Sequence, residues 1–435
     1  PPPPSYFWWG RSEVTMTDRN GTRQIEWQAS GCPSLGASLL VVAALVAVAN
    51  DERVAAQCQY EVTVITAPPC GPFSTIPEPR GINDAGHVVG AFRRCDGEGD
   101  SAFLWTPDGG FVALDVPPPF RDARAADIND LGQIVGSLHR PPFFRSEAVL
   151  WCGGRAVELG IPKGGNFSGA AAINARGDVV GTWGNNAGEP ARSGFVWRDG
   201  ELVVLDLPKG PNAVVHDIAD TGYIVGHMGS TRVTGANAFA LLEPDTELLP
   251  IPDDAIGAEA TGVNNLGHVA GYVVWPDDAP PGWTTRGAVW QAGHFIDLGV
   301  VPGSQSGRAD DINDIGQVVG RSRMPEAATL WQNGVLMDLN DLIASEIDDV
   351  IRQAYAINNR GQIVARTSGA WGAILTPVNR PPTDVDADCR TGITDLLYVV
   401  ANWGICSSAS NCIGDTNDDR VVDHLDMTAV LASWD

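Results

Sequence analysis

Short apolar runs return along this chain at a nearly constant interval. The pattern is clearest in "GINDAGHVVG" from Gly81, "DINDLGQIVG" from Asp127 and "AINARGDVVG" from Ala172. Aligning the central glycine of the motif gives seven copies, 45 to 49 residues apart, at Gly86, Gly132, Gly177, Gly222, Gly267, Gly316 and Gly361. A fixed period in this range is typical of solenoids, propellers and other repeat arrays.

Each repeat holds four runs that read as short β-strands. The first ends in "AxxIN", the second reads "QIVG" or "HVVG", the third "AFLW" or "AVLW", and the fourth "LDLP" or "ELGIP". The "NDxG" between the first two fits a type I turn whose Gly takes a left-handed conformation. Four short strands in each repeat match a propeller blade, and the 3.6-residue period of helical repeats is absent.

The two ends of the array support a closed ring. The seventh repeat lacks a fourth strand, whereas a spare strand, "YEVTVIT" (Tyr60 to Thr66), precedes the first repeat. Placing this strand on the outer edge of the last blade completes the ring and leaves only short edges. We therefore predict an all-β, seven-bladed β-propeller over residues 58–379, a linker at 380–383, and a small α-helical calcium-loop domain over 384–435.

The motifs "INDxGQVVG" and "AFLW" resemble the HAF-type extracellular repeats of secreted bacterial proteins. The His that gives that family its name is replaced here, for example by Ser101, Glu147, Ser193 and Asn237. The resemblance implies an exported β-propeller-like module and no defined activity. We interpret the repeated Asn-Asp-x-Gly as turn chemistry, and the repeated tryptophans as packing between blades: Trp105, Trp151, Trp197, Trp290 and Trp331.

A ligand site in a propeller is expected where the repeat is broken. The positions two and four residues before the repeat's Ile or Val vary sharply, and if this run is the innermost strand they ring one mouth of the channel. The candidate ligand-binding residues are Arg124, His216, Glu259, Arg308, Asp310, Gln353 and Tyr355, together with Arg80. The alternative is that these are solvated strand ends.

The composition limits the classes of partner. A formal charge of −25 argues against nucleic acid and anionic membranes, which attract clustered Lys and Arg. No G-x-S-x-G, H-E-x-x-H or Walker motif is present. Four histidines, His139, His216, His227 and His294, show no metal-ligand spacing, and we interpret each as incidental.

The N-terminal 57 residues lie outside the repeat. Met16 is a plausible start, Arg19 and Arg23 give a basic segment, the run from Ser38 to Ala49 is apolar but too short to span a bilayer, and Val54-Ala55-Ala56 offers a cleavage signal. We predict an untranslated or signal-peptide region, a secreted or cell-surface location, and no membrane span in the mature protein; a buried helix is the alternative. Among the cysteines, Cys406 and Cys412 are the expected pair, and the remaining pairings stay open.

The last 52 residues contain one acidic motif twice, from Asp384 and from Asp415. Oxygen side chains fall at positions 1, 3, 5 and 12 of a twelve-residue loop that leads into an apolar helix, which is the spacing that Ca²⁺ requires. The first predicted ligand set is Asp384, Asp386, Asp388, the carbonyl of Arg390, and Asp395. The second is Asp415, Asn417, Asp419, the carbonyl of Val421, Asp423 through water, and Asp426. A solvated acidic tail would explain neither the duplication nor the apolar helices.

This pair resembles the type I dockerin family over Asp384 to Asp435, with "TDLLYVVANW" and "LDMTAVLASW" matching the helices. The resemblance implies docking onto a cohesin-like or cell-surface protein. Two features depart from the calcium-loop pattern: position 6 is Cys389 or Arg420 in place of Gly, and position 9 of the first loop is Gly392. A non-Gly residue in a left-handed conformation costs about 1–2 kcal/mol.

Two functions are compatible with these features. The first is a secreted binding protein whose propeller recognises an extracellular ligand, a glycan or a protein, while the calcium module attaches it to a scaffold. The second is a secreted polysaccharide-degrading enzyme, a glycoside hydrolase or lyase, with its active site at the propeller mouth. The absence of a catalytic motif favours the first.

Overall fold

The structure is a computed structural model. The residues it describes are 13–18, 21–26, 58–68, 76–96, 99–140, 145–185, 192–207, 212–229, 235–242, 245–278, 282–345, 347–369, 371–378, 380–387, 389–405, 413–417 and 419–433. The chain divides into two compact units, Pro1–Val54 and Ala55–Asp435. The first unit contains an antiparallel hairpin of β1 (Glu13–Asp18) and β2 (Gly21–Glu26). The predicted apolar segment from Ser38 to Ala49 lies outside the described residues.

The second unit contains seven four-stranded antiparallel sheets, one for each sequence repeat. The first blade comprises β4 (Pro77–Ile82), β5 (Val88–Arg93), β6 (Asp100–Thr106) and β7 (Gly110–Ala113). The second comprises β8 (Asp122–Ile128), β9 (Ile134–Arg140), β10 (Arg145–Cys152) and β11 (Arg155–Gly160). The third comprises β12 (Phe167–Ile173), β13 (Val179–Gly184), β14 (Ser193–Arg198) and β15 (Glu201–Val204).

The next three blades repeat the same order. The fourth comprises β16 (Ala213–Ile218), β17 (Ile224–Gly229), β18 (Ala236–Leu242) and β19 (Asp245–Leu248). The fifth comprises β20 (Gly257–Val263), β21 (Val269–Pro276), β22 (Trp283–Gln291) and β23 (His294–Gly299). The sixth comprises β24 (Ser306–Ile312), β25 (Val318–Arg323), β26 (Ala327–Gln332) and β27 (Val335–Asp338), followed by the 3₁₀ turn η1 (Leu339–Leu342).

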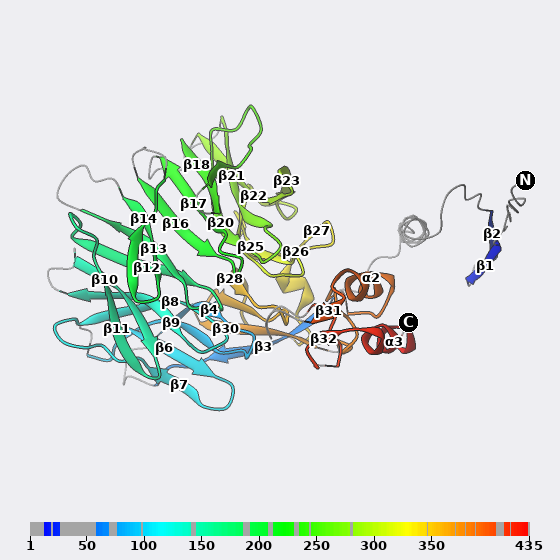
Figure 1. The fold of residues 1–435 in the computed structure, drawn as a ribbon, viewed down its shortest axis with the longest axis horizontal. Helices are drawn as coiled ribbons and strands as arrows, with labels where there is room; N and C mark the ends of the chain where they lie inside the picture. The colour runs from blue at the N-terminus through cyan, green and yellow to red at the C-terminus, as the bar shows by residue number, and fades with distance from the viewer. Residues whose placement is uncertain are drawn as a thin grey trace, which may run out of the picture. The chain divides into compact units, whose positions relative to one another are not determined.

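The seventh blade is closed by the strand that precedes the first repeat. It comprises β28 (Ile351–Ile357), β29 (Ile363–Thr367), β30 (Gly372–Val378) and β3 (Gln59–Ile65). β3 pairs antiparallel with β30 from Gln59 opposite Val378 to Ile65 opposite Gly372, and the two strands run side by side in Figure 1. The predicted closure is therefore present, and the fold is a seven-bladed β-propeller.

The core lies between the blades, where the repeated apolar residues of one sheet meet those of the next. Trp151, 1% exposed, packs with Val89 and Ala102 of the preceding blade and donates from its indole Nε1 to the Asp115 carbonyl at 2.8 Å. Trp290 likewise donates to the Pro250 carbonyl at 2.7 Å. The donated bonds satisfy the one polar atom of each buried ring, so large apolar area is buried without a desolvation cost. These two contacts match the expected packing role of the repeated tryptophans.

After β30 the chain forms two short helices. These are α2 (Ile393–Ala401) and α3 (His424–Ala432), with a two-residue antiparallel bridge between β31 (Gly404–Ile405) and β32 (Val421–Val422). Val385, Val399, Val422 and Val430 form a small buried cluster between them. Among the described residues, no helix is both long enough and apolar enough to cross a bilayer.

Candidate functional site

The first strand of every blade lies innermost. Each contacts the first strands of both neighbouring blades, so β4, β8, β12, β16, β20, β24 and β28 surround the channel. Every one of them has a register shift two residues before its final Ile or Val, for example between Val215 and Asp217 and between Ala309 and Asp311. A bulge of this kind leaves one residue out of the ladder and redirects its side chain. The extra residues include Arg80, His216, Asp310 and Tyr355.

The predicted ligand-binding residues come together at one mouth of the channel. They line a single open cavity of about 500 Å³. The predicted residues in its wall are Arg124, His216, Glu259, Arg308, Asp310, Gln353 and Tyr355, together with Arg80. Ser137, Thr261 and Tyr272 complete the polar part of the lining. We refer to this space as the mouth cavity. Its lining comes from six different blades, which is why no local sequence motif marks it.

Polar contacts hold the side chains of the mouth cavity in place. The Arg308 guanidinium lies 3.1 Å from an Asp310 carboxylate oxygen, and Gln353 donates to the other Asp310 oxygen at 3.0 Å. Arg80 stacks over the Tyr355 ring with its guanidinium carbon 4.7 Å from the ring centroid. Burial raises the pKa of Asp310, while Arg308 opposes that shift. The wall thus presents guanidinium groups, carboxylates and aromatic faces in fixed positions, a combination suited to a polar ligand.

Two histidines and a glutamate form a compact cluster on one side of the mouth cavity. His216 Nε2 lies 3.1 Å from His227 Nδ1, and His227 Nδ1 lies 3.7 Å from a Glu259 carboxylate oxygen. One ligand-type atom from each residue falls within 4.8 Å of the other two. The spacing of these histidines in the sequence gave no reason to pair them. They meet because β16 and β17 are adjacent strands and a bulge turns His216 toward its neighbour.

The opposite end of the inner strands carries the Asn-Asp-x-Gly turns. Asn83 accepts from the His87 amide at 3.0 Å, as a turn residue should, but its amide also donates to the Asn129 carbonyl of the next blade at 3.1 Å. The same link recurs from Asn129, Asn174, Asn264, Asn313 and Asn358, and the last of these returns to the Asn83 carbonyl at 2.8 Å. We call this circuit the asparagine ring. Ala219 stands at the fourth position, so the ring has six side-chain links.

Three half-buried aspartates line the channel, just before these turns. Asp127 accepts from the amide of Ile173, Asp217 from that of Val263, and Asp311 from that of Ile357, each in the following blade. Burial, opposed by these bonds and reinforced by the other aspartates, raises the pKa to about 7 for Asp127, about 6 for Asp217 and about 8 for Asp311. The residues at the same position of the alternate blades are small, Gly81 and Gly262 among them. A Cβ at Gly262 would lie 3.1 Å from an Asp311 oxygen, so the small residues leave room for the acids.

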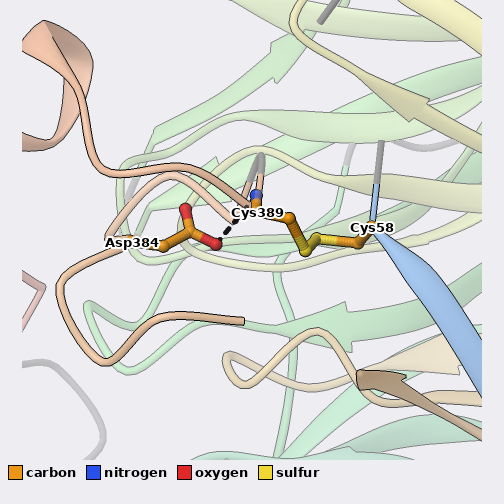
Figure 2. A group of neighbouring side chains, drawn as sticks. All are labelled: Cys58, Asp384 and Cys389. Atoms are coloured by element: carbon orange, nitrogen blue, oxygen red, sulfur yellow. Dashed lines mark hydrogen bonds between the residues drawn. A yellow bond between two sulfur atoms is a disulfide. The ribbon is translucent and has the colours of Figure 1, made fainter. Parts of the chain in front are cut away.

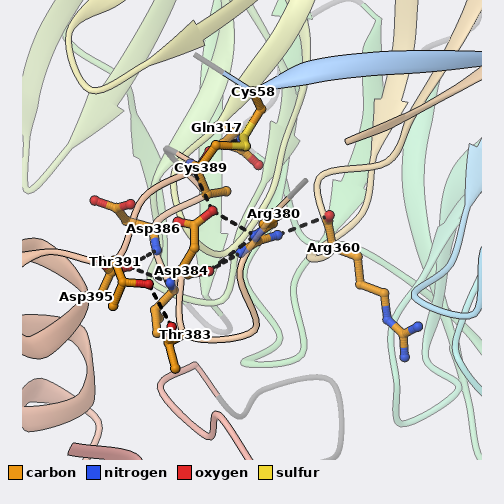
Figure 3. A network of polar contacts seen from close by, with 12 residues as sticks. Cys58, Gln317, Arg360, Arg380, Thr383, Asp384, Asp386, Cys389, Thr391 and Asp395 are labelled. Atoms are coloured by element: carbon orange, nitrogen blue, oxygen red, sulfur yellow. Dashed lines mark hydrogen bonds and ion pairs between the residues drawn. A yellow bond between two sulfur atoms is a disulfide. The ribbon is translucent and has the colours of Figure 1, made fainter. Parts of the chain in front are cut away.

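The first predicted calcium loop gathers three of its acids. Oxygens of Asp384, Asp386 and Asp395 lie within 4.8 Å of one another, and all three residues are buried. The Asp384 carboxylate accepts from the Cys389 amide at 2.9 Å and pairs with Arg380 Nε at 3.2 Å, as Figure 3 shows. Asp395 accepts from the amides of Val385 and Gly392 at the start of α2. Asp388 lies outside the described residues, and Arg390 is half-buried beside the loop.

The second loop repeats the backbone bonding of the first. Asp415 accepts from the Arg420 amide at 2.8 Å, and Asp426 accepts from the amides of Thr416 and Asp423. Asp423 also caps α3 by accepting from the Leu425 amide. Asn417 and Asp419 are exposed, and Val421 lies in β32. Within the described part of this loop, the acids do not form a cluster as compact as that of the first.

Both loops place a non-glycine residue in the left-handed region at position 6. Cys389 has φ 64° and Arg420 has φ 69°. For the first loop the structure supplies a reason, because Cys389 forms a disulfide with Cys58 at the start of β3 (Figure 2). The disulfide ties the loop to the strand that closes the propeller. Cys95 is also disulfide-bonded, Cys152 is an exposed free thiol, and the predicted pair Cys406 and Cys412 lies outside the described residues.

Further contacts attach the first loop to the turn-bearing face of the propeller. Gln332 donates to the carbonyls of Asp386 and Ala387 at 2.9 and 2.8 Å. Arg380 donates to the Arg360 carbonyl at 3.1 Å and to the Asp384 carbonyl (Figure 3). The acidic loops and the mouth cavity therefore lie at opposite ends of the channel.

No family model matches the chain, and no curated protein matches it. Solved structures with the same kind of fold include a streptogramin B lyase (12% identity, 73% of this chain and 98% of that chain, TM-score 0.47). The β-propeller domain of the Trilobed protease from Pyrococcus furiosus matches at 10% identity over 67% of this chain and 91% of that one, TM-score 0.47. An acylaminoacyl peptidase from Pyrococcus horikoshii matches at 10% identity over 68% of this chain and 49% of its own, TM-score 0.47. At this level of identity the comparisons bear on the fold alone.

Proposed function

We propose that the protein is an exported binding protein whose mouth cavity holds a polar extracellular ligand. The observation that carries the proposal is that all eight repeat-breaking polar residues, Arg80 included, line one cavity of about 500 Å³. If they were unrelated solvated strand ends, they would have no reason to gather at one mouth and to share a network of contacts. The disulfide between Cys58 and Cys389 supports an oxidising, extracytoplasmic location.

The chemistry of the wall favours a glycan that carries carboxylates. Arg80, Arg124 and Arg308 present guanidinium groups, which match a carboxylate bidentately, and Glu259 and Asp310 accept bonds from sugar hydroxyls. Tyr272 and Tyr355 add flat rings at the same wall. A protein segment with acidic side chains is the other ligand that this lining suits.

A binding panel tests this part of the proposal. The full chain is titrated calorimetrically with uronate-bearing oligosaccharides and with neutral ones, and reducing-sugar release is followed in the same samples. Arg308→Ala should weaken binding of the acidic ligand by about 10- to 100-fold, the equivalent of one charge-assisted bond. Arg155→Ala, at an exposed position of β11, the outermost strand of the second blade, is the matched control and should bind as the parent does. Sugar release that depends on Glu259 or Asp310 would replace the binding function with the enzymatic one.

We further propose that the C-terminal loops bind Ca²⁺ and serve as a docking module for a cohesin-like or cell-surface protein. Three buried carboxylates converge in the first loop, and Arg380 supplies one positive charge against them, so a divalent cation fits the remaining charge. Asp384, Asp386 and Asp395 would hold it, and Asp415, Asn417 and Asp426 would form the second site.

Calcium titration of the full chain tests the module separately from the mouth cavity. We expect two sites, with Asp395→Asn abolishing the first and Asp426→Asn the second. Asp297→Asn, at an exposed ion pair with Arg286 on the fifth blade, is the control. The absence of calcium binding in the unmutated chain would contradict the proposal for the module and leave that for the mouth cavity standing.

A further inference from the structure

We propose that His216, His227 and Glu259 form a binding site for a divalent transition metal ion of the Zn²⁺ class in the wall of the mouth cavity. Two imidazoles and a carboxylate are a ligand set that Zn²⁺ accepts, and catalytic zinc sites leave a further position open. The C-terminal acids offer oxygen alone, the donor type that suits Ca²⁺. The metal site is thus distinct in chemistry and in place from the calcium loops.

The geometry already approaches that of a bound metal. With metal–nitrogen distances of about 2.0–2.1 Å and tetrahedral angles, neighbouring ligand atoms lie about 3.4 Å apart. The His216 Nε2 to His227 Nδ1 distance is 3.1 Å, and His227 Nδ1 to Glu259 oxygen is 3.7 Å. Each distance differs from the ideal by a few tenths of an ångström, which a small rotation of a side chain corrects.

The two ring nitrogens that face each other, His216 Nε2 and His227 Nδ1, lie within hydrogen-bonding distance at 3.1 Å, so one of them carries the shared proton. A metal ion would take the place of this proton, because each neutral imidazole has one ring nitrogen free to ligate and the tautomer can change so that this nitrogen faces the ion. Glu259 is hydrogen-bonded by Tyr272, a second partner of the kind that orients a metal-ligating carboxylate.

The surroundings leave both charge and space for the ion. Arg308, which lines the same cavity, lies 3.1 Å from Asp310, which offsets its charge locally. His216 and Glu259 line the open mouth cavity, while His227 is 6% exposed behind them. With His227 behind the wall and His216 and Glu259 at its surface, the ion would sit in the wall. Its remaining coordination positions would face the cavity.

Zinc titration of the full chain tests the site. The protein is freed of metal, calcium is added in excess to occupy the C-terminal loops, and zinc chloride is titrated by calorimetry. We expect one zinc ion per chain. His216→Ala should weaken its binding by about 100-fold or more, because losing a ligand costs at least as much as losing a second-shell partner. His294→Ala removes an exposed histidine from β23 and should leave the affinity unchanged.

Two further measurements keep the result clear. Because His227 is buried, His227→Gln replaces its imidazole with a side chain of similar length, and its thermal unfolding is recorded beside its zinc affinity. Co²⁺ substitution gives a visible spectrum in which histidine coordination is detected, and the bands should disappear in His216→Ala. A chain that binds no zinc, or that binds it equally well in all the variants, would overturn the proposal.

Discussion

The asparagine ring is expected to contribute measurably to the stability of the propeller, and Asn358 is the best place to test it. Its amide donates to the Asn83 carbonyl at 2.8 Å, which links the last blade to the first without a covalent bond. It also donates to the Gln362 side chain at 2.9 Å and accepts from the amides of Gln362 and Arg360 at 2.8 and 3.1 Å. The substitution Asn358→Ala removes all four bonds at once.

The magnitude follows from these bonds. A typical intramolecular hydrogen bond contributes a net 0.5–1.5 kcal/mol, and a buried group left without a partner costs about 1–3 kcal/mol. Asn358 is 5% exposed and the Asn83 residue that it contacts is 4% exposed, so water replaces these bonds poorly. We expect Asn358→Ala to lower the free energy of unfolding by about 2–4 kcal/mol.

The chain provides its own counterpart, since Ala219 occupies the ring position in the fourth blade. Ala219→Asn would add a donor toward the Asn264 carbonyl and should raise stability by about 1 kcal/mol. Guanidinium unfolding followed by tryptophan fluorescence measures both variants, with an unchanged slope required for the comparison. A loss below about 0.5 kcal/mol in Asn358→Ala would refute the reasoning, because it would show that the turn holds without its side chain.

Three other outcomes are expected. Cys58→Ser removes the disulfide to Cys389, whose two cysteines lie 331 residues apart in the chain. This should lower the free energy of unfolding by up to about 6 kcal/mol, because the unfolded chain regains its loop-closure entropy. The guanidinium midpoint measures the change, and a parent chain with the same midpoint in reducing and in oxidising buffer would contradict it. Trp151→Ala should cost about 3–5 kcal/mol, and Trp197→Ala, at a half-buried ring, distinctly less, as urea unfolding would show. The stability that Asp311 contributes should fall as pH rises from about 4 to about 8, because its carboxyl retains in the folded state a proton that the unfolded chain releases, and the same sign holds for Asp127 and Asp217. Asp311→Asn should therefore gain stability relative to the parent over this range, and a difference in urea midpoint between the two chains that does not change with pH would disprove the role of this carboxyl.

The architecture was accessible from the sequence because it is written seven times. Each repeat has four strands, but the last repeat lacks its fourth strand and a spare strand, Tyr60 to Thr66, precedes the first repeat. The simplest arrangement closes the ring with this spare strand, and β3 indeed pairs with β30 in the last blade. The predicted packing role of the repeated tryptophans agrees with the structure at Trp151 and Trp290, since the indole of each donates to a carbonyl at the end of the preceding blade. The asparagines were understood only in part. Turn chemistry explained Asn83 within its own blade, but the bond to Asn129 joins residues 46 positions apart, and local preferences say nothing about it.

The mouth cavity shows where sequence reasoning ends. The variable positions were identified, yet which of them share a cavity depends on the curvature of the ring. His227 was interpreted as incidental, because its partners His216 and Glu259 lie 11 residues before it and 32 residues after it, on three different strands. The one signal available was that His216 occupies the variable position of its blade. The Cys58–Cys389 disulfide was likewise open, since pairing across 331 residues follows from the ring closure and not from spacing.

The disulfide also determines how the molecule would carry a mechanical load. Gln59 at the start of β3 lies opposite Val378 at the end of β30, so these two chain ends leave the seventh blade side by side. A pull on the C-terminal module passes through the backbone into β30 and, through Cys389 and Cys58, into β3 as well. Because both strands are then pulled at the same end, the force does not peel one from the other. The cross-link therefore lets the two strands that close the ring, β3 and β30, share the tension.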